Sequence, residues 1–196
     1  LLLAAVAVAL MGLDRVGNRR RGDAAWRTAL AAYDPRYAIF VGTNITPADS
    51  LKAWLPHLKR LDERFVLITH HDTTVDEVDK ACRAAGLTVP IVFRPKFRGL
   101  EKALTPGMNA AFYVHNSLLN NQMVSRRELN HVLLNHRESE AGDNWSPMAA
   151  MYDQVFVAGR VARERFTRHD VFIPDSKFRI VGRPQVSSLE VRRPSP

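Results

Sequence analysis

His136 is the residue of this chain whose type and position are best suited to proton transfer. It follows the apolar run 131–135, and Glu138, Ser139 and Glu140 come soon after it. A neutral imidazole can take a proton from a hydroxyl near neutral pH, and a nearby carboxylate can orient the ring. We therefore treat His136 as a candidate general base. The alternative is a loop histidine that makes only local hydrogen bonds.

A second polar cluster follows the apolar run 110–114. It contains Asn116 and Ser117, and Asn120 lies one helical turn further on. Neutral donors and acceptors of this kind suit the hydroxyls of a polyol and the oxygens of a phosphate. Asn116 or Ser117 could equally cap a helix. Both interpretations remain open at the level of the sequence.

Arg183 follows the apolar run 178–181 and could hold a phosphate through two hydrogen bonds. The alternative is a surface arginine before a turn.

Motifs of three other enzyme classes are absent from the sequence. The chain has no G-x-G-x-x-G motif of dinucleotide-binding enzymes, no Walker A motif of P-loop NTPases and no H-E-x-x-H motif of zinc proteases. Cys82 lies in a helical pattern and is expected to be a packed small hydrophobe. His70 and His71 would point to opposite faces of a strand end, so we predict no metal site.

The elements that must position these residues are short apolar runs alternating with helical patterns. Strands are predicted over 37–41, 64–69, 89–93, 110–114, 131–135, 154–158 and 178–181, and helices over 47–61, 75–85 and 160–169. Strands that alternate with helices predict a parallel sheet covered on both faces. We therefore expect an α/β fold with a Rossmann-like doubly wound parallel sheet. Ligands of such sheets bind at the carboxyl ends of the strands, where each polar cluster falls.

Composition and charge narrow the classes of protein further. The chain has 196 residues, of which 46% are apolar, and this favours a folded domain over a disordered tail. The single cysteine excludes a disulfide scaffold. The net charge of +8 is uneven: residues 37–159 are neutral, whereas 14–36 carry +3 and 160–196 carry +5. No nucleic-acid-binding module is recognisable, so we predict no nucleic-acid partner.

The segment 1–13 reads LLLAAVAVALMGL and carries no charge. A membrane-spanning helix needs about 20 apolar residues, and arginines beyond such a span usually mark its cytoplasmic side. We expect a truncated transmembrane helix over 1–13, followed by a basic juxtamembrane segment over 14–36 that contacts lipid headgroups. This predicts a cell-membrane protein with its folded domain on the cytoplasmic face. A signal peptide and a buried N-terminal helix are the alternatives.

Four motifs follow one another along the chain: Asn116-Ser117 with Asn120-Asn121, the decapeptide HVLLNHRESE (131–140), the stretch 152–159 and the stretch 178–185. In this order they resemble the CDP-glycerol glycerophosphotransferase family of teichoic-acid-type polymer synthesis. The likeness is clearest from about residue 110 to 185. It implies a GT-B enzyme with two Rossmann-like domains and no cofactor. Such an enzyme moves glycerol phosphate from CDP-glycerol to a hydroxyl of a lipid-linked polyol-phosphate acceptor.

The resemblance also implies roles for individual residues. A histidine in a His-Gly-x-Ser-like loop is important for catalysis in such families, and that motif maps onto His136 with Ser139 in register. Arg137 stands where the family usually has glycine, and it could block the site or add a phosphate contact. The residues expected to bind substrate are Asn116, Ser117, Asn120, Glu138, Ser139 and Arg183.

The donor-binding domain of the family lies beyond the last motif. We therefore expect residues 37–183 to be the acceptor-side domain, the N-terminal half of a GT-B fold, and 184–196 to lead toward a missing donor-binding domain. Such a fragment would be inactive alone. Two other functions stay open: a membrane-tethered, non-catalytic α/β binding module, and another GT-B transferase that uses a sugar nucleotide.

Overall fold

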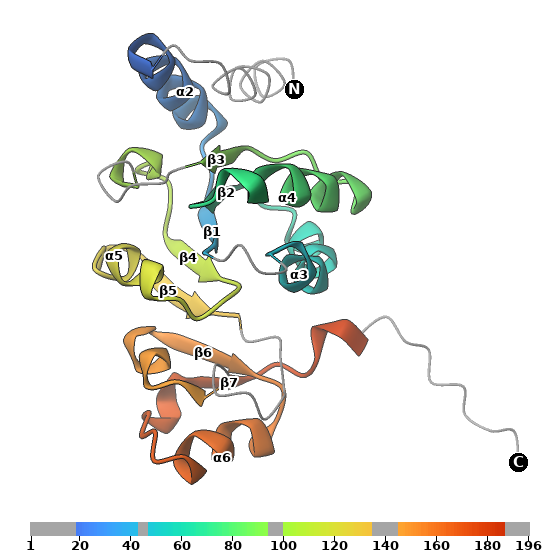
Figure 1. Cartoon of the computed structure of the whole chain (residues 1–196), viewed down its shortest axis with the longest axis vertical. Helices are drawn as coiled ribbons and strands as arrows, with labels where there is room; N and C mark the ends of the chain where they lie inside the picture. The colour runs from blue at the N-terminus through green and yellow to red at the C-terminus, as the bar shows by residue number, and fades with distance from the viewer. Residues whose placement is uncertain (1–18, 43–46, 94–99, 135–144, 187–196) are drawn as a thin grey trace, which may run out of the picture.

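The computed structural model describes residues 19–42, 47–93, 100–134 and 145–186, which form one seven-stranded sheet with helices on both faces (Figure 1). All neighbouring strands pair in parallel, in the order β3-β2-β1-β4-β5-β6-β7. The strands are β1 (Tyr37–Val41), β2 (Phe65–Thr69), β3 (Ile91–Phe93), β4 (Ala110–Tyr113), β5 (Asn130–Leu133), β6 (Gln154–Val157) and β7 (Phe178–Ile180). The predicted Rossmann-like α/β sheet is confirmed.

The connections between the strands are helical. The longer helices are α2 (Arg19–Tyr33), α3 (Pro47–Leu61), α4 (Asp72–Ala84) and α6 (Arg160–Arg168). The shorter ones are η2 (Glu101–Ala103), η3 (Leu118–Asn120), α5 (Asn121–Val124), η5 (Pro147–Met151), η6 (Asp175–Lys177) and η7 (Pro184–Val186). A parallel pair of strands requires such a crossover.

Two apolar clusters hold the layers together, one on each face of the sheet. Alternate residues of a strand point to opposite faces, so Ile39 packs under α3 and α4, whereas Phe40 packs under the other helices. The first face is closed by Leu51 and Leu55 of α3 with residues of α4. The second face is closed by residues of α2, α5 and α6.

Helix α2 lies within the segment expected to be juxtamembrane, and it packs into the body of the domain. Trp26 is 2% exposed and Leu30 is completely buried, and both belong to the cluster on the second face. The helix ends at Tyr33, where Asp34 takes a left-handed conformation (φ 51°) ahead of Pro35. Residues 1–13 lie outside the described residues. Among the residues that are described, no helix is long and apolar enough to cross a membrane.

The boundaries that differ from the sequence prediction have local causes. Helix α4 begins three residues earlier than predicted, with His71 as its N-cap and the Asp72 carboxylate in its first turn, where a negative charge favours the helix dipole. Strand β3 begins only after Pro90, which has no N–H to donate. The Pro90 carbonyl still accepts from Leu67 N at 2.9 Å.

The sheet reverses its strand order between β1 and β4. From β1 the chain builds outward to β2 and β3 and then returns to place β4 on the other side of β1. The connection after β1 runs through α3 and the one after β4 through η3 and α5, which lie on opposite faces. The carboxyl ends of the two strands at such a reversal are the usual ligand site of doubly wound folds.

Candidate functional site

A serine and a histidine meet at this reversal of strand order. Ser50 Oγ, in the first turns of α3, and His115 Nε2, just after β4, lie 2.7 Å apart, a hydrogen bond whose direction follows the imidazole tautomer. Ser50 is completely buried, while His115 is half-buried. The serine is thus a positioning group for the ring and cannot itself reach a substrate.

Asn120 fixes the backbone of the same loop. It is completely buried, and its Nδ2 donates to the His115 carbonyl and to the Tyr152 hydroxyl, both at 2.7 Å. The Tyr152 hydroxyl in turn donates to Asn116 Oδ1 at 3.3 Å. Ser50, His115, Asn116, Asn120 and Tyr152 are called the switch-point cluster below.

Gly42 and Ser117 border the cluster. A Cβ at residue 42 would lie 3.0 Å from Asn120 Oδ1 and 3.5 Å from Ser117 Cβ, so glycine permits β1 to end against this loop. Ser117 Oγ accepts a hydrogen bond from Leu119 N at 3.2 Å and caps η3. The capping role that the sequence left open for Ser117 is thus present in the structure.

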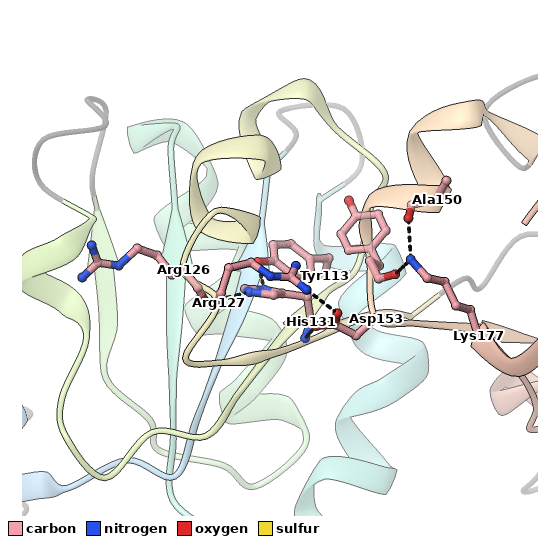
Figure 2. Close-up of polar contacts among 8 residues, drawn as sticks. Tyr113, Arg126, Arg127, His131, Ala150, Asp153 and Lys177 are labelled. Atoms are coloured by element: carbon pink, nitrogen blue, oxygen red, sulfur yellow. Dashed lines mark hydrogen bonds and ion pairs between the residues drawn. The ribbon is translucent and has the colours of Figure 1, made fainter. Parts of the chain in front are cut away.

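A chain of polar contacts runs through Tyr113, whose ring packs against Tyr152 of the cluster with centroids 5.0 Å apart (Figure 2). The Tyr113 hydroxyl lies 2.9 Å from His131 Nδ1, and His131 Nε2 lies 2.9 Å from the Arg126 carbonyl. Because a carbonyl can only accept, the proton sits on Nε2 and Tyr113 donates to Nδ1. Asp153 accepts from the His131 N–H at 2.9 Å and from Arg127 at 3.1 Å. These contacts tie β4, β5 and the start of β6 together.

Lys177 holds the segment that carries Tyr152. Its ammonium donates to the carbonyls of Ala150 and Tyr152 at 2.8 and 2.9 Å, and Figure 2 shows the side chain reaching that turn from the end of η6. Burial raises the pKa of the Tyr152 phenol, so the hydroxyl keeps its proton and remains a donor to Asn116.

The half-buried members of the switch-point cluster, His115 and Asn116, offer one imidazole and one neutral amide, while its buried members hold them in place. Such groups bind hydroxyls and phosphate oxygens without introducing charge, and the imidazole can exchange a proton. Within the described ranges no three His, Cys, Asp or Glu side chains gather as metal ligands. Cys82 lies elsewhere, 1% exposed in the α4 packing, and burial raises its thiol pKa to about 12. It is the packed hydrophobe that the sequence predicted.

The structure brings three of the predicted site residues together and leaves the others apart or undescribed. Asn116, Ser117 and Asn120 all lie at the carboxyl ends of β1 and β4. Arg183 is exposed in the segment between β7 and η7, and η7 packs beside α3. The predicted residues outside the described ranges are His136, Glu138 and Ser139.

Sequence reasoning missed Gly42, Ser50 and Tyr152. Gly42 directly follows a predicted strand, a position that could have marked a close approach of the backbone. Ser50 and Tyr152 carry no comparable signal, since one lies within a helical pattern and the other before a strand.

The fold and the cluster define a class: a doubly wound α/β domain with a neutral polar cluster at the reversal of its strand order. The chain matches no protein-family model, no curated protein and no solved structure.

Proposed function

We propose that this chain is the acceptor-side part of a transferase that moves glycerol phosphate from CDP-glycerol to a hydroxyl of a lipid-linked polyol-phosphate acceptor at the cell membrane. The acceptor oxygen attacks the phosphorus that carries the glycerol, and a new P–O bond forms. The P–O bond to the cytidine-bearing phosphate breaks and CMP leaves. His136 accepts the proton of the attacking hydroxyl. The GT-B organisation belongs to the same proposal.

The observation that carries this proposal is the switch-point cluster. Its neutral groups suit a polyol phosphate, and it lies where doubly wound sheets bind ligands. Leu134 N donates to the Tyr113 carbonyl at 2.8 Å, so β5 ends at the sheet edge where His115 lies. The choice of CDP-glycerol as the donor rests on the four sequence motifs that resemble the glycerophosphotransferase family.

The direct test measures nucleotide release. The gene product that carries this chain is incubated with acceptor membranes and either CDP-glycerol or a UDP-sugar, and free CMP and UDP are quantified. The proposal predicts CMP from CDP-glycerol and its loss in His136→Ala, with the far-UV circular dichroism unchanged. An active His136→Ala enzyme contradicts the assignment of the base.

The other outcomes identify the other functions. UDP released from a UDP-sugar, without CMP, identifies a different GT-B transferase. Release of neither nucleotide, with acceptor binding retained, identifies a non-catalytic module tethered at the membrane.

A second test addresses the switch-point cluster itself. Gly42→Ala places a methyl group 3.0 Å from Asn120 Oδ1, and Asn120 cannot retreat without losing two buried hydrogen bonds. We expect CMP release to fall about tenfold or more, because displacement of a positioned group is costly. Gly159→Ala is the matched control, since nothing lies within 4 Å of its added Cβ. Equal rates for the two variants would contradict a ligand site at the switch point.

A further inference from the structure

An apolar cavity of about 440 Å³ lies between α3 and the first face of the sheet, within the size range of small-molecule sites. Its walls are Trp54 and Leu58 of α3, Phe112 of β4 and Phe156 of β6, together with two further leucines. It uses the second half of α3, whereas Ser50 of the switch-point cluster lies in the first turns of the same helix. No residue of the switch-point cluster lines the cavity.

The cavity lies where α3 meets the first face of the sheet. Trp54 of α3 contacts Phe156 of β6, with ring centroids 6.1 Å apart. Phe112 and Phe156 are only half-buried. Leu61, at the end of α3, is 56% exposed at the rim of the cavity. An apolar surface of this kind binds apolar groups.

The polar part of the lining is cationic or neutral. Arg60 is exposed and His57 is half-buried, and these residues lie three apart on one side of α3. Among the residues that the structure describes, no carboxylate lines the cavity; Asp62 and Glu63 follow α3 along the chain but are not part of its wall. The lining thus combines an apolar interior with a positive rim.

We propose that this cavity binds an anionic single-chain amphiphile, a hydrocarbon chain that ends in a phosphate or a carboxylate. The chain lies against Trp54, Phe112 and Phe156, and the anionic head lies at Arg60. A nucleobase fits less well, since the lining provides few groups to pair with its polar edges. The proposal goes beyond the transferase function and does not depend on it.

Isothermal titration calorimetry of the full chain tests the proposal with three monomeric dodecyl probes. They are dodecyl phosphate, dodecyltrimethylammonium and a neutral dodecyl ether, each below its critical micelle concentration. We expect dodecyl phosphate to bind with one site per chain, the neutral probe more weakly and the cation most weakly. Absence of binding, or equal affinity for the anion and the cation, would overturn the proposal.

Matched variants locate the binding. Arg60→Gln is expected to weaken dodecyl phosphate about fivefold without affecting the neutral probe, whereas Lys52→Gln, which removes a charge from an exposed part of α3, has no effect. Phe156→Asp abolishes binding of all probes, and Phe172→Asp, at a 76% exposed position, does not. Circular dichroism verifies that each variant is folded. Binding that survives Phe156→Asp in the folded protein refutes this location.

Discussion

The Tyr152 hydroxyl is the centre of the switch-point cluster. It accepts a hydrogen bond from Asn120 Nδ2 and donates one to Asn116 Oδ1, so one oxygen orders two amides of the cluster. Tyr152 itself is completely buried. A buried polar group that loses its partner costs about 1–3 kcal/mol, since water cannot replace the missing bond. The geometry of the switch-point cluster therefore depends on a buried residue.

Replacement of this tyrosine gives a test with an internal control. Tyr152→Phe leaves the amides of Asn120 and Asn116 each without one partner, and we expect the free energy of unfolding to fall by about 1–3 kcal/mol. Tyr37→Phe also removes a phenolic hydroxyl, but the Tyr37 hydroxyl is buried and makes no hydrogen bond with any described residue. That variant is expected to be neutral or slightly more stable. Urea denaturation of both proteins measures the difference, and equal losses would contradict the role of the network.

At the scale of elements, His131 joins β5 to its neighbours. Its ring bonds to Tyr113 of β4 and to the turn at Arg126, and its backbone N–H bonds to Asp153 before β6. Burial lowers the pKa of His131 below 6.5, although the bond to the Arg126 carbonyl and the charge of Asp153 oppose this shift. The folded protein thus keeps a neutral imidazole that both bonds require.

This arrangement predicts a pH dependence of stability. As the pH falls below about 6.5, His131 of the unfolded chain takes a proton while the buried ring does not. The unfolded state then binds more protons, so the free energy of unfolding decreases with falling pH. Urea titrations at pH 7.5, 6.5 and 5.5 should show this decrease in the native protein and a smaller one in His131→Gln. His169→Gln, at an exposed position, should keep the native slope; a native slope in His131→Gln would exclude His131 as its source.

At the scale of the whole molecule, α2 closes one face of the sheet. Its Trp26 is 2% exposed and packs in the cluster that also contains residues of β1, β4 and α6. The segment predicted to be basic and juxtamembrane is therefore part of the folded domain from at least Arg19 onward. Its burial contributes to the stability of the entire domain.

Truncation of this tryptophan tests that conclusion. Trp26→Ala leaves a large hole in a packed cluster, and we expect a loss of about 3–5 kcal/mol in the free energy of unfolding. Leu118→Ala, at a residue that is 71% exposed, should change it by less than about 0.5 kcal/mol. Thermal and urea denaturation give both values. A small effect of Trp26→Ala would mean that α2 is only loosely attached to the sheet.

Much of the fold could be predicted because its signals are local. The predicted helix 47–61 coincides with α3, and the predicted strand 37–41 coincides with β1, since apolar periodicity reports directly which faces are buried. The predicted starts of α4 and β3 are wrong, because α4 takes in the acidic Asp72 at its first turn and β3 begins only after Pro90, which has no N–H. The placement of Asn116, Ser117 and Asn120 at the carboxyl edge of the sheet could be predicted because they follow a strand; their role in binding stays a prediction.

The sequence by itself determined that the chain alternates strands with helices and that polar groups follow the strands, because both properties depend on neighbouring residues. Only the tertiary structure decided which of those groups meet. Ser50 and His115 are 65 residues apart and touch only because the strand order reverses between β1 and β4. Asn120 and Tyr152 are 32 apart and meet through the pairing of β4, β5 and β6. Contacts between distant segments are set by the packing of layers, which no local pattern of residues encodes.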